Sequence, residues 1–256
     1  MASDDGMKAA NQLANEIFHR SVFAWGSVFT FREMCRHGRS QAIGAIAQER
    51  AANVREVLSS DEYAGLFTVD RKDISPDTID QWLGTLIQND AKTYEASLDA
   101  ASLVFAHSLL DGIAMDLCRV CSLVRPTDFM RWVDQKRFSL ADSQHKLWLD
   151  LLKMSVSDYL KTVERESIIK KLDLLFSLCQ PPKKFEPMAG YRYDRERIQA
   201  LDDLRHRYVH GAYPAERLTK GDDDLVFLQR TSLFLLGLVN QRYGIHIDSS
   251  ALQQQP

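Results

Sequence analysis

The chain has 256 residues, enough for one or two domains, and its 45% hydrophobic and 26% charged residues are ordinary for a globular protein. Glycine and proline are scarce, at 12 and 7 residues, which disfavours a turn-rich all-β protein and favours helices. The formal net charge of −3 gives no overall basic footprint, so binding of nucleic acid by bulk charge alone should be weak.

The amino terminus, MASDDGMKAANQLANE, is polar and acidic and lacks the basic and apolar regions of a secretory signal. The longest strongly apolar run, LFLLGLV near residue 233, is far too short to span a bilayer. We therefore expect a cytoplasmic protein without membrane contact. Cys118 and Cys121 form a C-x-x-C inside a predicted helix, and they are expected to be structural thiols, not a metal or redox site.

The first 75 residues predict helices. An early apolar stripe steps by four, three and four residues, through Phe18, Val22, Trp25 and Phe29. The segment SQAIGAIAQERAANVREVL predicts a second helix with Ser40 as its N-cap, and Gly38 then marks a basic turn between two helices. Ser75 followed by Pro76 is a start signal for the next helix. We expect residues 1–75 to form an N-terminal helical extension.

The strongest helical segment runs from about residue 88 to 124 and is stopped by Pro126. Its apolar residues alternate by three and four: Leu103, Ala106, Leu110, Ile113, Leu117, Val120 and Val124. Residues 125–160 predict shorter helical pieces that form an insertion. The following helix, VERESIIKKLDLLFSLC, is ended by Pro181 and Pro182.

Two further helices are predicted near the carboxyl end, over residues 194–210 and 223–242. The second is apolar almost all round, which predicts a buried helix. Asp222, Asp223 and Asp224 precede it and can cap it and complement its dipole. Residues 248–256 are polar and are expected to be a loose tail. No glycine-rich phosphate loop is present in the sequence, and no cofactor is expected.

The stretch LRHRYVHGAY, residues 204–213, closes the first of these two helices. Its apolar stripe consists of Ile198, Leu201, Leu204 and Tyr208. Arg205 borders this stripe, and an arginine there needs a carboxylate or a bound anion because an unpaired buried charge is costly. His206 and His210 are four residues apart and share another face. Gly211 predicts the helix end, so that the carbonyl terminus favours a charged His210.

An arginine and a histidine near one helix end suit phosphate chemistry. The histidine can take or give a proton near neutral pH, and the arginine can hold a phosphate and stabilise its developing charge. RNA carries its own nucleophile, the 2′-hydroxyl, so neither a metal nor a nucleophilic side chain is required. Arg205 and His210 are about 140° apart around an ideal helix. Either the last turn unwinds, or two copies of the helix face each other across a dimer.

The motif RHRYVHG resembles the signature of the HEPN superfamily, in which an arginine and a polar residue precede a histidine by a few positions. Here Arg205 and His210 enclose four residues, and His206 is the polar one. The resemblance covers roughly residues 88–245 and implies an all-α, up-and-down four-helix bundle. Its core helices would be 88–124, 162–180, 194–210 and 223–242, within a domain spanning residues 76–247.

Many HEPN proteins are metal-independent endoribonucleases of toxin–antitoxin and phage-defence systems. The resemblance implies that Arg205 and His210 are catalytic, that His206 supports them, and that a homodimer forms one composite RNA-binding cleft. It also implies an antitoxin or regulatory partner. Some of these toxins carry a modifiable tyrosine two residues after the histidine, whereas this chain has Ala212 there and Tyr213 one position later.

An acidic or polar residue on the first core helix often faces the motif in this family. The candidate here is Asp111, one turn after His107, which could pair with Arg205 or orient a histidine. A solvated Asp–His pair on the helix surface is an open alternative. At the level of function, the alternative is a non-catalytic helical interaction module, in which Arg205 pairs with such an acid and His210 merely caps its helix.

Two further patterns complete the sequence evidence. Arg36, His37 and Gly38 match the triplet of histidine phosphatases, but that family places it after a parallel strand and none is predicted here. From Lys183 to Lys220, nine Lys or Arg residues stand against six Asp or Glu residues. This basic balance would steer RNA toward the motif end of the molecule.

Overall fold

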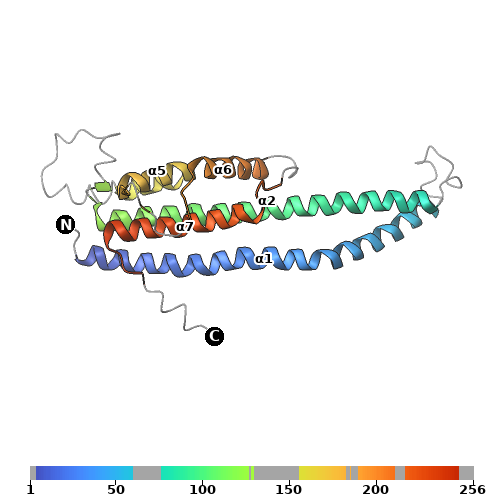
Figure 1. The fold of residues 1–256 in the computed structure, drawn as a ribbon, viewed down its shortest axis with the longest axis horizontal. Coiled ribbons are helices and arrows are strands. Elements are labelled where there is room, and N and C mark those ends of the chain that lie inside the picture. Colours follow the sequence, from blue (N-terminus) through green and yellow to red (C-terminus); the bar gives the residue numbers. More distant parts are fainter. Residues whose placement is uncertain are drawn as a thin grey trace, which may run out of the picture.

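The computed structural model describes residues 4–59, 76–126, 128–129, 156–182, 185, 190–210 and 217–247. Throughout these ranges the regular secondary structure is helical, without any strand (Figure 1). The prediction of an all-α protein is therefore confirmed. Most of the predicted insertion at 125–160 and the tail at 248–256 lie outside the described residues.

Helix α1, Asp4–Ser59, is one continuous helix of 56 residues. It begins with Asp4 and Asp5, whose charges complement the positive end of the helix dipole. The predictions of a turn at Gly38 and of a new helix capped by Ser40 were wrong, because both residues lie inside α1. A single glycine costs a helix only about 1 kcal/mol relative to alanine. Ion pairs on both sides of Gly38 hold this part of α1 in place.

Helix α2, Pro76–Val124, contains 49 residues and begins at the proline predicted to start it. It extends twelve residues further toward the amino terminus than the apolar seam alone indicated, and it ends just before Arg125 and Pro126. The N–H of Arg125 still bonds to the carbonyl oxygen of Cys121 at 3.0 Å. The helix therefore stops where the proline removes the next backbone donor.

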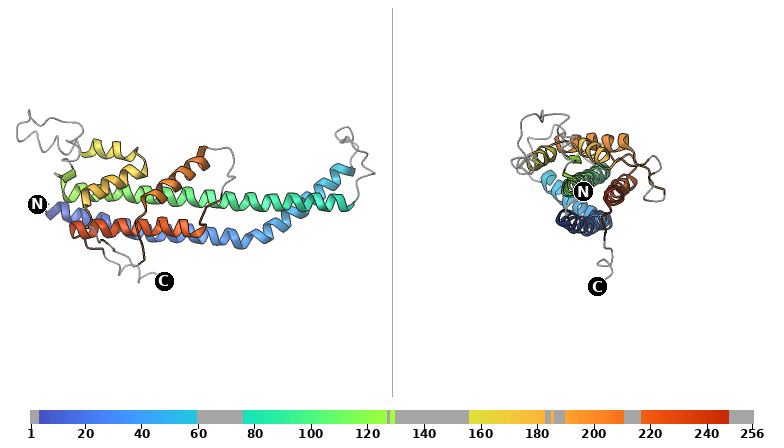
Figure 2. Two further views of the ribbon diagram at one scale, coloured as in Figure 1. Left: turned by 45° about the horizontal axis from the view of Figure 1, so that its top comes forward. Right: turned by 90° about the vertical axis from the view of Figure 1, so that its left-hand side faces the viewer.

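Helices α1 and α2 form a long antiparallel hairpin, and the other helices cover only one half of it (Figures 1 and 2). The covered half contains the beginning of α1 and the end of α2. Beyond Arg32, none of the described side chains of α1 is buried. We call residues 36–59 of α1 and 76–95 of α2 the arm, because together they project from the remainder of the molecule as two paired helices.

Three shorter helices pack on the covered half: α5, Ile168–Cys179, α6, Arg195–His210, and α7, Asp222–Tyr243. A separate short helix spans 156–164. The single helix predicted from residue 162 was wrong, because a turn and bend at 165–166 separate these two pieces. Gln180 ends α5 in the left-handed conformation directly before the two prolines. The predicted helices at 194–210 and 223–242 are found within one residue of their bounds.

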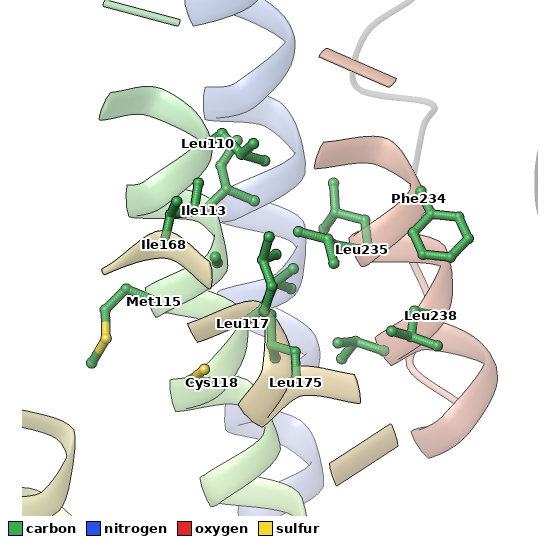
Figure 3. Packing of buried hydrophobic residues seen from close by; sticks show 14 of the residues in the cluster. Leu110, Ile113, Met115, Leu117, Cys118, Ile168, Leu175, Phe234, Leu235 and Leu238 are labelled. Carbon is green, nitrogen blue, oxygen red and sulfur yellow. The ribbon is translucent and has the colours of Figure 1, made fainter. Parts of the chain in front are cut away.

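The core lies between α2 and the other four labelled helices, all of which contact α2. Figure 3 shows side chains of α2, α5 and α7, among them Leu117, Leu175 and Leu235, gathered between the helices. Residues of the predicted N-terminal extension join the same core, including Ile17 and Trp25, both at most 1% exposed. The Trp25 indole N–H also donates to Ser232 Oγ at 3.0 Å.

One stretch of α2, Gln81–Val124, is long and apolar enough to cross a membrane by length and composition. The sequence predicted that no apolar segment is long enough to span a bilayer, and this helix does not meet that expectation by length and composition. However, 56% of its apolar window is buried inside the protein. Core helices of soluble proteins are buried in this way.

We expect Leu117→Ala to lower the free energy of unfolding by about 2–5 kcal/mol, because Leu117 is fully buried and its truncation leaves a cavity. The matched control is Leu123→Ala on the same helix, where the side chain is 39% exposed and the loss should stay below about 1 kcal/mol. Urea unfolding followed by circular dichroism measures both. Equal losses at the two positions would contradict the packing described here.

Candidate functional site

Helix α6 carries the predicted motif, and its local sequence explains where it begins. Asp194 precedes the helix, and its Oδ1 accepts a hydrogen bond from the backbone N–H of Arg197 at 2.9 Å, as an N-cap residue does. Glu196 lies in the first turn and Arg207 and His210 in the last, which matches the helix dipole. The predicted apolar stripe is confirmed: Ile198, Leu201 and Leu204 are buried, and Tyr208 is half-buried.

Arg205 lies at the border of this stripe, as predicted, and is half-buried. Its Nε atom is buried, and within the described residues it has no hydrogen-bond partner. A buried guanidinium nitrogen without an acceptor is unfavourable by about 1–3 kcal/mol. The side chain can therefore donate to an oxygen-bearing anion that the described residues do not supply.

His206 and His210 are both exposed at the end of α6, and their ring centroids are 4.6 Å apart. Helix α6 remains α-helical through His210, so the last turn does not unwind. Arg205 and His210 consequently project about 140° apart around the same axis. Of the two explanations for their spacing, the unwinding of the last turn is therefore not found.

A buried contact between α2 and α6 lies beneath the motif. His107 of α2 is 4% exposed, and its Nε2 atom lies 2.8 Å from Asp202 Oδ1 on α6. The two atoms are close enough for an ion pair, although Nε2 makes no hydrogen bond of good geometry within the described residues. His107 lowers the pKa of the Asp202 carboxyl below its ordinary value; partial burial opposes this, and the charges of Arg205 and His206 assist it.

Asp111 does not take the role of a partner for Arg205. Its two carboxylate oxygens accept hydrogen bonds from Lys171 Nζ of α5 at 2.8 and 2.7 Å. Lys171 is only 2% exposed, so its ammonium group needs this carboxylate. The sequence-based pairing of Asp111 with Arg205 is therefore corrected. His107 and Asp111 are one turn apart on α2, but His107 contacts α6 whereas Asp111 contacts α5.

The chain after the motif is anchored by a cluster of charged residues that sequence reasoning missed. Asp99 of α2 accepts hydrogen bonds from Arg32 of α1, from Arg217 and from the backbone N–H of Leu218, at 2.6, 2.6 and 3.3 Å. The side chains of Arg32 and Asp99 are 3% and 2% exposed. One carboxylate thus joins α2 to α1 and to the segment that leads into α7.

Asp222 and Asp224, in the first turn of α7, both pair with arginines of other helices. The N-cap position is Gly221, which makes no side-chain cap bond. Asp222 pairs with Arg32 and Arg36, and Asp224 Oδ1 accepts a hydrogen bond from Arg197 Nη2 at 2.6 Å. The expected charge complement in the first turn is present, and Asp224 Oδ2 also accepts a hydrogen bond from the backbone N–H of Lys220 at 3.0 Å, just before the helix.

Three cysteines gather in the core and do not form a reactive site. Cys118, Cys121 and Cys179 are buried and free, and Cys179, which the sequence left isolated, lies against Cys121. Burial raises the pKa of both Cys118 and Cys121 well above the ordinary value. The thiols of Cys118 and Cys121 therefore stay protonated at neutral pH and are poor nucleophiles and ligands.

Other sequence patterns are placed as follows. Arg36, His37 and Gly38 lie on α1, with no strand before them in the described chain, so the phosphatase arrangement is not formed. Tyr213 and Gly211 lie outside the described residues. Within the residues that the structure describes, no group of three or more His, Cys, Asp or Glu side chains is arranged to hold a metal ion.

Comparisons with known proteins give no assignment: no family model matches the sequence, and no curated protein or solved structure matches it significantly. The side chains around α6 are therefore the basis for a functional proposal.

We expect Asp99→Asn to lower the free energy of unfolding by about 3 kcal/mol, because it removes the buried one of the two carboxylates that balance the buried Arg32. Asp173→Asn is the control, since Asp173 pairs with Arg195 at the surface and both side chains are 52% exposed. Its loss should be under about 1 kcal/mol. Urea unfolding at pH 7 compares them, and a loss at Asp99 no larger than that at Asp173 would rule out a central role for the cluster.

Stability should also depend on pH through Asp222. Arg36, and after it Arg32, lowers the pKa of this carboxyl below its ordinary 3.8. Its contribution is therefore complete above about pH 4 and is lost as the pH falls through the lowered value. Asp222→Asn should be less stable than the wild type at pH 6, and the difference should shrink steadily below pH 4. Thermal unfolding from pH 6 to pH 2 measures this, and a difference that grows on acidification would contradict it.

Proposed function

We propose that this protein is a metal-independent endoribonuclease of the HEPN type that acts as a homodimer. The observation that carries the proposal is Arg205, whose buried Nε atom has no acceptor in the described chain and which shares a helix end with two exposed histidines. An RNA phosphate supplies the oxygen atoms that this guanidinium lacks. His206 and His210 supply imidazole side chains, the groups that most often act as general acid and base.

The proposed reaction requires only side chains and the RNA. His210 removes the proton from a ribose 2′-hydroxyl, and the resulting oxygen attacks the adjacent phosphorus. The bond to the 5′-oxygen breaks, and that oxygen receives a proton from a second histidine. Arg205 binds the non-bridging oxygens, where negative charge builds up. The products are a 2′,3′-cyclic phosphate and a 5′-hydroxyl end.

A second copy of the chain gives this chemistry its geometry. Arg205 and His210 of one helix cannot address one phosphorus atom, since they project about 140° apart. Two α6 ends that face each other would place the arginine of one protomer opposite the histidine of the other. The resemblance of RHRYVHG to the HEPN motif supports the same arrangement. It also supports a cytoplasmic role in a toxin–antitoxin or phage-defence system, with an antitoxin or regulatory protein as partner.

The charge near the motif is consistent with an RNA substrate. Arg207 and His210 lie in the last turn of α6, and Arg217 and Lys220 follow it. Part of this charge is neutralised internally, since Arg217 pairs with Asp99 and Glu95. RNA affinity should therefore come from a local basic surface at one end of the molecule, and it should weaken with added salt.

Cleavage of total cellular RNA and tRNA in EDTA tests the proposal. We expect the wild type to produce fragments with 2′,3′-cyclic phosphate ends, and His210→Ala to cut at least about 100-fold more slowly, the usual contribution of a general acid or base. Arg205→Ala should be similarly impaired. His246→Ala is the control, because this exposed histidine lies outside the α6 cluster and the interactions found for it use its backbone.

The opposite result would favour an interaction module. If a folded wild-type dimer leaves every RNA intact at high concentration, the nuclease proposal fails. The arm then becomes the region of interest, because it exposes large apolar side chains: Ile46 is 44% exposed and Trp82 is 64% exposed. Cleavage by His210→Ala at the wild-type rate would also reject the assignment, since it would point to a contaminating nuclease or to another site.

A further inference from the structure

The polar residues of the candidate site form a row that runs from the core to the surface. His107 is buried between α2 and α6, and the Asp202 side chain beside it is 17% exposed. Asp202 precedes Arg205 by three positions and His206 by four, so all three share one face of α6. His206 then contacts His210 at the exposed helix end. The basic side chains of this row are His107, Arg205, His206 and His210. Among the described contacts, Asp202 is the only carboxylate found in the row.

This carboxylate has three basic neighbours, His107, Arg205 and His206. Arg205 is within reach of Asp202 on the same helix face, and its charge already acts on the carboxyl group. Nevertheless Asp202 contacts His107, at 2.8 Å, and Arg205 Nε is left without an acceptor. An arginine normally takes a neighbouring carboxylate readily, since its planar guanidinium matches the carboxylate geometry. The contact with His107 is what distinguishes this site from an ordinary intrahelical ion pair.

We propose that His107 is a positioning residue: it holds the Asp202 carboxylate away from Arg205, so that this half-buried guanidinium is not neutralised within its own helix and can bind a phosphate anion. This inference rests on the proposed function only in taking the natural anion to be the phosphate of RNA. Without His107, Asp202 turns to Arg205, satisfies Nε and neutralises the charge that would bind phosphate. Removal of Asp202 as well opens the guanidinium again.

The two neighbouring aspartates of the described chain, Asp111 and Asp203, have other partners and do not pair with Arg205. On α2, Asp111 lies one turn from His107, but both of its oxygens are taken by Lys171 of α5. On α6, Asp203 accepts a hydrogen bond from Gln199 at 2.9 Å and is exposed. Among the described residues, Asp202 is therefore the carboxylate whose position decides whether Arg205 is paired within the protein.

The experiment is a titration of the full-length protein with inorganic phosphate, followed on the Nε–H signal of Arg205 in nitrogen-15 NMR spectra. Arg205→Lys assigns the signal. We expect the wild-type signal to shift with phosphate, and His107→Leu to weaken phosphate binding about five- to tenfold, the change expected for loss of one charge-assisted contact. The double variant His107→Leu/Asp202→Asn should return to within about twofold of Asp202→Asn alone.

Recovery of phosphate affinity in the double variant separates positioning from a structural role. If His107 only stabilised the fold, the second substitution would weaken the protein further and would not restore binding. His107→Gln retains a donor for Asp202 and should bind phosphate within about twofold of the wild type. Asp203→Asn is the matched control and should leave the titration unchanged. If His107→Leu does not fold, Asp202→Asn alone decides: binding at least as tight as in the wild type supports the inference, and weaker binding overturns it.

Two other results overturn the inference: a wild-type Arg205 signal that ignores phosphate, or a folded His107→Leu variant that binds phosphate like the wild type. A double variant as weak as His107→Leu does the same. The titration contains no RNA, so its outcome is separate from that of the nuclease assay. Phosphate binding with the expected variant pattern, but no RNA cleavage, would retain the role of His107 and reject the proposed enzyme.

Discussion

The apolar seam of α2 is the constraint on which the other helices depend. Residues such as Leu103, Leu110 and Leu117 are completely buried, and α1, α5, α6 and α7 all pack on this one helix. Burial of apolar surface is strong but non-directional, so a seam of leucines alone tolerates sliding and rotation of its partners. Something more specific must set where each helix lies along α2.

Three polar residues lie beside that seam on α2, and each contacts a different helix. Asp99 takes Arg32 of α1 together with Arg217, His107 takes Asp202 of α6, and Asp111 takes Lys171 of α5. Sliding a helix along α2 would break such a buried polar contact, so these pairs favour one register for each helix. The end of α6, and the basic side chains on it, are positioned as a result.

Local sequence patterns were sufficient for the elements but not for their partners. The α2 seam, the stripe of α6 and the start of α2 at Pro76 follow from patterns within a few residues, and those predictions are confirmed. The continuity of α1 past Gly38 was not predictable in this way, because it depends on ion pairs to residues far away in the chain. The same holds for the site. The position of Arg205 at the edge of the buried face is a local property of its helix. The contacts of Asp202 with His107, and of Asp111 with Lys171, depend on how α2, α5 and α6 pack together.

The two halves of α1 are held by different forces, and this affects how the molecule responds to ionic strength. Its first half is fixed by buried apolar side chains such as Ile17 and Trp25. Past Arg32 the helix is held largely by partly exposed ion pairs, among them Arg36 with Asp222 and Arg39 with Glu95. Dissolved salt screens exposed charges but leaves hydrophobic contacts intact, and strongly hydrated anions such as sulfate strengthen them. Concentrated salt should therefore loosen the attachment of the arm while the bundle beside it becomes tighter, so that one unbroken helix has ends of opposite salt sensitivity.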